Sequence, residues 1–275
     1  LVVEEQHWTA AATRVPGSPF GAPALRLSRL LGVNSVLARA ARVSRGRSAA
    51  VLVLPELSLP RQWFRAVANH VVRFGGFGLV VGLEYLHDLA QLRVRDQALA
   101  VLPGPFSSVA TWPWTKRLPA REEERLLANL PTPVSFPPLP AQRPPRTVVR
   151  SPWGTFSVLI CSEILEARRV ADLLGRVELV LCPAWNRDTS SYDHLIQSAG
   201  FQLHAIIAIA NNGHYSDCRS WAPREVRWER DLCRLIEREV NDVVHVDIPL
   251  TSLAAFHASR GARPTGWRPL PPDWP

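Results

Sequence analysis

The stretch Gly154-Thr-Phe-Ser-Val-Leu-Ile-Cys-Ser-Glu-Ile-Leu165 decides how the rest of the chain can be interpreted. Its apolar residues, from Phe156 to Ile160, predict a short buried strand. Cys161 follows at the end of that strand, beside a loop, where a substrate could reach a thiol. An isolated cysteine is more often a small core residue, so the interpretation depends on what accompanies it.

Two further residues accompany Cys161. The chain has 32 Lys and Arg residues, and Lys116 is the only lysine among them. A lysine offers a compact charge whose pKa moves on burial, whereas an arginine keeps its proton. Glu56 follows a second predicted buried strand, Val51 to Leu54, after Pro55. A carboxylate, an ammonium and a thiol together supply a base, a cation and a nucleophile.

These three segments resemble the motifs of the nitrilase superfamily of carbon–nitrogen hydrolases. The matching segments are Leu54-Pro55-Glu56-Leu57, Lys116 and Leu159-Ile160-Cys161-Ser162-Glu163, in the family's order and with gaps of 60 (116 − 56) and 45 (161 − 116) residues. The resemblance extends over nearly the whole chain. It implies a four-layer α-β-β-α sandwich with the site at the strand ends, no cofactor, and homo-oligomers that form through a helix layer.

The resemblance also implies roles for individual residues. Glu56 would take the proton of Cys161, and the thiolate would attack the carbon of an amide or nitrile to form a thioester. Lys116 would favour the thiolate and, with the backbone amide of Ser162, stabilise the developing negative charge. In several subfamilies a second glutamate lies eight residues after the lysine, which here is Glu124.

Some expectations about the site stay open. Glu122 and Glu123 are rivals of Glu124, and all three could instead form an ordinary acidic first turn of a helix. Glu163, Trp185 and Asn186, which also follow predicted strands, are expected beside the substrate or the oxyanion. Cys182 also ends a predicted strand, but Pro183 follows it and offers no amide hydrogen, so Cys182 is assigned to the core.

A second function is compatible with the sequence. The segments Leu54-Pro-Glu-Leu-Ser-Leu-Pro-Arg61 and Gly82-Leu-Glu-Tyr85 resemble nitrilase-like domains fused to reverse transcriptases in bacterial antiviral defence systems. The residues after Cys161 depart from the usual family pattern: Ser162 replaces an aromatic residue. The alternative is therefore an assembly or nucleic-acid-associated module of a larger protein, with little or no hydrolase activity.

Alternating strands and helices predict an α/β fold, with one domain over residues 1–257 and a proline-rich tail over 258–275. Within the domain the patterns predict a strand over residues 1–8, a helix over 226–239 and a last strand over 243–248. Glu84, in the strand predicted over 79–86, could face the site or could be a salt-bridged structural acid.

The composition limits the function classes. Hydrophobic residues make up 47% of the chain and charged residues 20%, which permits a large core. The net charge of +8 permits nucleic acid as a partner, but the arginines are scattered. Four cysteines without paired spacing indicate a reducing, cytoplasmic setting and no metal site. No apolar run is long enough to span a membrane. The first residue is Leu and Met is absent, so the chain is expected to be a piece of a longer protein.

Overall fold

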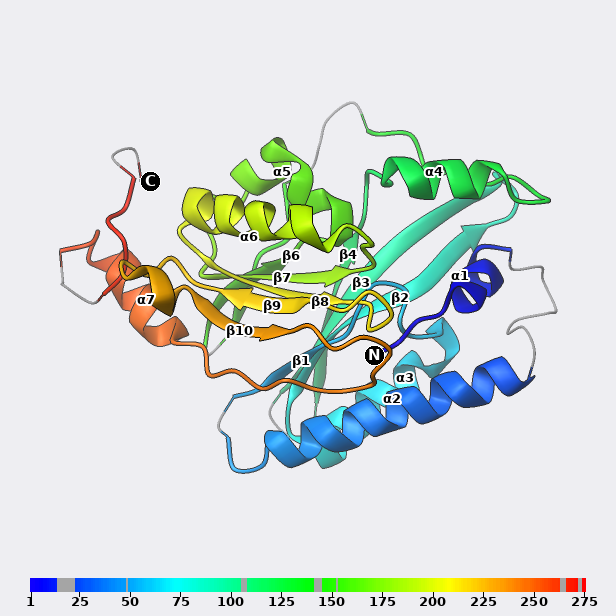
Figure 1. Ribbon diagram of the computed structural model, residues 1–275, viewed down its shortest axis with the longest axis horizontal. Helices are drawn as coiled ribbons and strands as arrows, with labels where there is room; N and C mark the ends of the chain where they lie inside the picture. The colour runs from blue at the N-terminus through cyan, green and yellow to red at the C-terminus, as the bar shows by residue number, and fades with distance from the viewer. Residues whose placement is uncertain are drawn as a thin grey trace.

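Four layers make up the structure, a computed structural model that describes residues 1–275 except 14–22, 48, 105–107, 141–144, 152, 263–265 and 272–273. Two β-sheets lie face to face. Helices α5 (Ala167–Ala171) and α6 (Thr189–Leu203) cover one sheet, and helices α2 (Pro23–Val43) and α3 (Phe64–His70) cover the other (Figure 1). The α-β-β-α sandwich predicted from the sequence is confirmed.

The first sheet has the order β1-β2-β3-β4. The short strand β1 is parallel to β2, and the other pairs are antiparallel. A cluster of buried aliphatic side chains, including Val36, Val71 and Leu79, joins this sheet to α2 and to the turn after α3. The strands are β1 (Val51–Val53), β2 (Gly78–Asp88), β3 (Arg93–Pro103) and β4 (Val109–Thr115).

The second sheet has the order β10-β9-β8-β7-β6-β5. Its centre, β6 to β8, is parallel, so the carboxyl ends of these strands meet at one edge. Parallel strands are covered on both faces, and β7 is buried at every position. The strands are β5 (Val149–Ser151), β6 (Gly154–Val158), β7 (Leu179–Ala184), β8 (Ile206–Asn211), β9 (Cys218–Trp221) and β10 (Asp231–Leu235).

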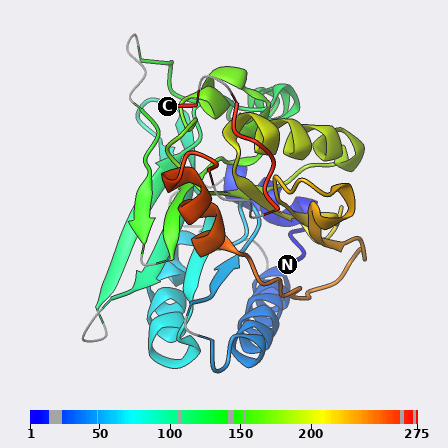
Figure 2. The same cartoon turned by 90° about the vertical axis from the view of Figure 1, so that its left-hand side faces the viewer.

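The remaining elements close the edges of the sandwich. Helix α7 lies across the end of the molecule that faces the viewer in Figure 2, and α1 and α4 lie toward the opposite end in Figure 1. These elements are α1 (Glu5–Ala12), η1 (Arg61–Trp63), η2 (Val71–Gly75), α4 (Arg121–Ala128), η4 (Cys161–Leu165), η5 (Arg227–Glu229) and α7 (Leu250–Ala258). Among the described residues, no helix is both long and apolar enough to cross a membrane.

Three predicted elements were wrong. Residues 1–8 contain no strand, because the amides of Val2 and Val3 donate to the side chains of Asn241 and Asn212, at 2.8 and 2.7 Å, and α1 then begins. The helix predicted over 226–239 is replaced by η5 and by β10, which pairs with β9. Residues 243–248 run without a strand partner within the described chain. In the first two cases long-range partners override the local pattern.

The C-terminal segment packs on the sandwich through a histidine pair. His204, in left-handed conformation after α6, donates from Nε2 to the carbonyl of Arg268 at 2.7 Å, and its Nδ1 lies 3.1 Å from Nε2 of His257. The ring of Trp274 lies against both histidines. Burial lowers the pKa of His204 to about 4, and the charge of His257 acts in the same direction.

One glycine lets the turn with Glu56 approach the sheet. A β-carbon on Gly82 of β2 would lie 2.4 Å from the α-carbon of Glu56 and 2.6 Å from the carbonyl oxygen of Pro55. The amide of Gly82 also donates to that carbonyl at 3.2 Å. Only glycine permits this contact between backbones, so Gly82 fixes the depth at which Glu56 enters the structure.

The histidine pair predicts a stability change in acid. The pKa of His204 is lower in the folded chain than the unfolded value of about 6.5, so the unfolded chain binds more protons below that pH. The contribution of neutral His204 is complete above about pH 6.5 and is lost as the pH falls toward about 4. The difference in melting temperature between wild type and His204→Asn should shrink over that range. Thermal unfolding of both proteins at several pH values between about 4 and 6.5 measures the change.

The close approach at Gly82 predicts a second effect. Gly82→Ala should destabilise the fold by about 1–3 kcal/mol, because the added methyl displaces the backbone of the Glu56 turn. Chemical denaturation measures the loss. Gly32→Ala in α2 is the matched control, since its new β-carbon would meet only side-chain atoms, at 3.2 Å. Equal stabilities of the two variants would contradict the steric argument.

Candidate active site

Three strand ends bring Glu56, Lys116 and Cys161 together. Glu56 lies in the turn after β1, Lys116 directly follows β4, and Cys161 opens η4 soon after β6. The Nζ of Lys116 lies 2.7 Å from Oε1 of Glu56, and the charges of both residues act on the thiol of Cys161. The three residues are only 3%, 2% and 6% exposed, respectively. The structure thus brings a carboxylate, an ammonium and a thiol together inside the protein.

The second acid at Lys116 is Glu123 and not Glu124. Oε2 of Glu123 lies 2.6 Å from Nζ of Lys116 and accepts from the amide of Ala120 at 3.1 Å, while its Oε1 accepts from the hydroxyl of Tyr85 at 2.6 Å. Glu124 is exposed on the outer side of α4. Helical geometry explains the correction, because neighbouring residues on a helix point about 100° apart and only one of the three acids can face the lysine.

A third carboxylate, from Asp96 of β3, lies in the same cluster, and sequence reasoning missed it. Asp96 is fully buried, and its Oδ2 lies 3.7 Å from Nζ of Lys116. A signal was present in the alternation of β3, where Val94, Asp96 and Ala98 all point inward. An acid at an inward strand position is rare unless it is paired.

Contacts within the cluster shift the pKa values of Glu56 and Lys116. Burial alone would raise the pKa of Glu56, but the charge of Lys116 and hydrogen bonds from Asp96, Lys116 and Cys161 lower it below its usual value. The amide of Trp185 also donates to Oε2 of Glu56 at 3.1 Å. Burial would lower the pKa of Lys116, but the carboxylates of Glu123 and Glu56 raise it well above its ordinary value. Glu56 is therefore a carboxylate and Lys116 an ammonium at neutral pH.

The nucleophile itself is a thiol at rest. Burial and the charge of Glu56 raise the pKa of Cys161, although Lys116, the hydroxyl of Tyr192 and the backbone of Trp185 act in the opposite direction. Lys116 was expected to favour the thiolate, and it does, but burial outweighs it. Cys161 has a positive φ of 47°, an unusual conformation for a non-glycine residue that aims its side chain away from the strand direction.

A residue absent from the sequence analysis also reaches the nucleophile. The hydroxyl of Tyr192, on α6, donates to Sγ of Cys161 at 3.5 Å and is buried with it. Cys182, predicted to be a core residue, is fully buried and donates weakly to the carbonyl of Cys161 at 4.0 Å. The core assignment of Cys182 is confirmed.

The residues expected beside the substrate divide into two kinds. Glu163 is fully buried in an ion pair with Arg146 and accepts from the amide of Ile160 at 3.0 Å, so it supports the loop from behind. Ser162 and Trp185 follow strand ends at the site, and Trp185 contacts Glu56 through its amide. Asn186 is held by Asn211, whose Oδ1 accepts its amide at 2.9 Å, and it shapes the turn after β7.

A buried ion pair holds the Glu56 turn from the other side. Arg29 of α2 lies 2.7 Å from Glu84 and donates to the backbone carbonyls of Ser58 and Leu57. Glu84 is therefore the structural acid of the two alternatives that the sequence left open. Through Arg29, the outer helix layer fixes the position of the turn that carries the base.

The acids of the cluster also form a set of oxygen donors. Glu56, Asp96 and Glu123 each place one carboxylate oxygen within 4.8 Å of the others. Such a set suits a hard cation. The ammonium of Lys116 lies at 2.7, 3.7 and 2.6 Å from these three carboxylates and offsets part of their charge.

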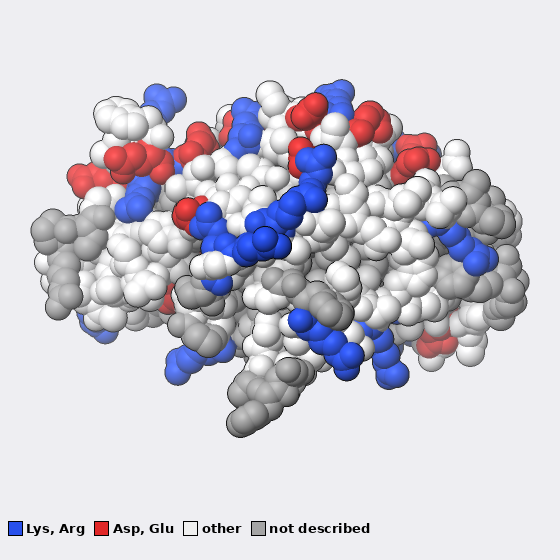
Figure 3. Space-filling view, turned by 90° about the horizontal axis from the view of Figure 1, so that it is seen from below, with Lys and Arg blue, Asp and Glu red and all other residues white. Residues whose placement is uncertain are grey.

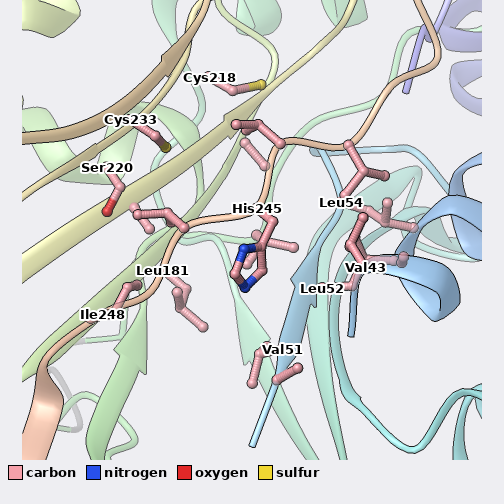
Figure 4. Close-up of a pocket in the computed structure, with 18 of the residues that line it drawn as sticks. Val43, Val51, Leu52, Leu54, Leu181, Cys218, Ser220, Cys233, His245 and Ile248 are labelled. Carbon is pink, nitrogen blue, oxygen red and sulfur yellow. The ribbon is translucent and has the colours of Figure 1, made fainter. Parts of the chain in front are cut away.

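A cavity of about 470 Å³ lies apart from this cluster. Figure 4 shows it between β1, with Val51 and Leu52, and the segment that carries His245 and Ile248. Its lining is mostly aliphatic and includes none of Glu56, Lys116 and Cys161. This cavity is therefore not the space around Glu56, Lys116 and Cys161.

Comparison with known proteins gives structural neighbours. No protein-family model and no curated protein matches the chain. Among solved structures, a cysteine-to-serine mutant of the Nesterenkonia AN1 amidase from the nitrilase superfamily has a TM-score of 0.59 at 18% identity, covering 84% of this chain and 90% of that one. The chain has the nitrilase-superfamily fold.

A second solved structure gives the same result. A cysteine-to-alanine mutant of the amidase from Nesterenkonia sp. AN1, in complex with butyramide, has a TM-score of 0.59 at 19% identity, with coverage of 84% and 89%. The similarity therefore spans most of both chains.

Loss of the Tyr192 hydroxyl should lower the rate at which the Cys161 thiol is alkylated, without unfolding the protein. Tyr192→Phe removes the donor to Sγ, so iodoacetamide should label Cys161 about threefold to tenfold more slowly at neutral pH, as the loss of one hydrogen bond implies. Peptide mapping of labelled protein measures the rate. Tyr215→Phe is the control, because that hydroxyl contacts Arg187 and not the cluster. Unchanged labelling in Tyr192→Phe would show that the contact does not act on the thiol.

Proposed function

We propose that this protein hydrolyses the carbon–nitrogen bond of a small non-peptide amide through a Glu56–Lys116–Cys161 triad. The observation that carries the proposal is the contact of Lys116 with Glu56 at 2.7 Å, beside the buried thiol of Cys161, whose pKa both residues influence. A carboxylate in contact with a nucleophilic thiol and a neighbouring cation is the arrangement that acyl transfer requires.

The first half of the reaction forms a thioester. Glu56 takes the proton of Cys161 as Sγ attacks the amide carbon, and the carbonyl π electrons move to oxygen. Lys116 and the amide of Ser162 stabilise the resulting oxyanion. When the oxyanion collapses, the carbon–nitrogen bond breaks and the nitrogen leaves as an amine that takes the proton from Glu56.

The second half restores the thiol. Glu56, again a carboxylate, takes a proton from water as the water oxygen attacks the thioester carbon. The carbon–sulfur bond breaks, the proton returns to sulfur and the carboxylic acid leaves. Glu123 stays in contact with Lys116 throughout and holds the ammonium at the oxyanion position. Nothing in this cycle is oxidised or reduced.

Burial of the cluster supports a small substrate. Cys161 is 6% exposed, and aromatic side chains, including Trp8, Tyr85 and Trp185, pack together beside the acids. A short acyl group fits such surroundings with less rearrangement than a peptide would need. The fully buried Tyr85 also links Trp8 to Glu123 through its hydroxyl. An amide is favoured over a nitrile because the solved amidases share the fold.

The alternative of a nucleic-acid-associated module has weaker support. Figure 3, which views the molecule from the side of α2 and α3, shows basic side chains in a short band and at scattered positions, with acidic side chains mostly along the edge. Arg39 and Arg47, on and just after α2, already pair with Asp242 and Asp247. The reverse-transcriptase fusion, the homo-oligomer and the cytoplasmic location remain predictions.

Amide hydrolysis has a direct test. Wild-type protein should release ammonia from short aliphatic amides, and Glu56→Gln should lose about 10²–10⁴-fold in turnover, because the base is removed while the side-chain size is kept. Cys161→Ala should abolish turnover. Cys233→Ser, at a cysteine outside the cluster, should leave it unchanged.

Two results would refute the proposed function. One is the absence of ammonia release by the wild type over a panel of short amides. The other is turnover that survives Cys161→Ala. Salt-dependent binding of a labelled oligonucleotide by an inactive wild type would instead support the alternative module.

A further inference from the structure

The carboxylate cluster contains more acid than its one cation balances. Glu56, Asp96 and Glu123 bring three carboxylates within 4.8 Å of one another around Lys116. If all three were ionised, the buried cluster would carry two net negative charges. Three carboxylates that share a dry site with a single ammonium do not all ionise at neutral pH, so one of them keeps its proton.

The contacts identify the acid that keeps the proton. Glu56 accepts from Nζ of Lys116 at 2.7 Å and from the amide of Trp185 at 3.1 Å. Glu123 accepts from Lys116, Tyr85 and Ala120. Each of these two acids therefore has several donors that stabilise its charged form.

Asp96 has no comparable support. No donor among the described residues hydrogen-bonds to either of its carboxylate oxygens, and it is fully buried. One of its carboxyl oxygens lies within 4.8 Å of an oxygen of Glu56, and two carboxyl oxygens form a hydrogen bond only if one of them carries a proton. A charged Asp96 would be a buried anion whose closest cation, Lys116, lies at 3.7 Å and is shared with two other acids.

The electrostatics around Asp96 agree with this assignment. Burial, the charge of Glu56 and the hydrogen bond with it raise the pKa of Asp96 well above its usual range, and Glu123 adds to the effect. Lys116 acts in the opposite direction and is outweighed. Tyr85 also faces the cluster, and burial and the charge of Glu123 raise its pKa, so it stays neutral and donates to Glu123 while it accepts from Trp8.

We propose that Asp96 is a protonated carboxylic acid at neutral pH that donates a hydrogen bond to Glu56 and so keeps Glu56 ionised and oriented toward Cys161. Asp96 is thus a positioning residue that acts through Glu56. The effect on hydrolysis rests on the proposed function, whereas the protonation state does not. When Glu56 takes the thiol proton, Asp96 keeps its own, so the cycle above remains balanced.

The proton can be located in the wild-type protein. Samples labelled with ¹³C at the carboxyl carbon of aspartate alone, or of glutamate alone, separate the two residue types by NMR. At pH 7 the aspartate-labelled sample should show one carboxyl signal in the protonated range, and the glutamate-labelled sample none. A protonated signal from glutamate, or none from either sample, would overturn the proposal.

Variants of Asp96 test whether its proton acts on Glu56. Asp96→Asn keeps a neutral donor of nearly the same shape, so it should remove the protonated signal and leave the rate of Cys161 labelling by iodoacetamide within about threefold of wild type. Asp96→Ala leaves Glu56 without this donor and should slow labelling about tenfold or more, the expected effect of a hydrogen bond to a charged group. Glu124→Gln, at the exposed acid, should change neither signal nor rate.

The two proposals fail separately. A protonated aspartate signal without ammonia release would reject amide hydrolysis and keep this assignment. Ammonia release from a protein in which every aspartate is ionised at pH 7 would reject the assignment and keep the hydrolase. Equal labelling rates in Asp96→Asn and Asp96→Ala would also reject the positioning role, since only one of them retains a donor.

Discussion

The ammonium of Lys116, buried among carboxylates, is the constraint on which the rest of the structure depends. Burying an isolated ammonium costs free energy, and so does burying an isolated carboxylate. Here Lys116 lies at 2.7 Å from Glu56 and 2.6 Å from Glu123, so each charge compensates the others. Removing Lys116 would leave the carboxylates of Glu56 and Glu123 in the interior without this cation. The cluster is therefore both the candidate active site and a condition for folding around it.

The scaffold meets this constraint by joining elements from every layer. Glu56 enters through a turn that Gly82 lets approach the sheet and that Arg29 of the outer helix layer holds by its carbonyls. Cys161 enters from the second sheet and meets Tyr192 of α6. Because each group is fixed by its own element, the relative positions of base and nucleophile depend on how the two sheets pack.

The pKa values of Cys161 and Glu56 determine when the proton is transferred in the proposed reaction. Burial raises the pKa of Cys161, so the resting nucleophile is a thiol and not a thiolate. The lowered pKa of Glu56 keeps a carboxylate beside it. In the proposed reaction, proton transfer from Cys161 to Glu56 therefore accompanies the attack on the substrate. A dry site of this kind strengthens the interaction of Lys116 with a developing oxyanion, since no water screens it.

The sequence alone determined the fold class and predicted that Glu56, Lys116 and Cys161 lie together. Buried strands, read from runs such as Val51 to Leu54, and the polar residues at their ends were local signals, and so were the rare lysine and the spacing of the three motifs. An apolar run predicts a buried strand correctly because such a strand requires little more than apolar side chains. The same reasoning placed Cys182 in the core.

Only the tertiary structure decided which neighbours complete the site. Glu123 and not Glu124 faces Lys116, because the rotation of α4 against the sheet selects one of three consecutive acids. Asp96 and Tyr192 join the cluster from β3 and α6, elements whose packing no short motif encodes. Residues 226–239 turn from a helical pattern into η5 and β10 because an edge of the second sheet offers hydrogen-bond partners. Each of these outcomes depends on contacts between residues far apart in the chain, and a local pattern carries no information about them.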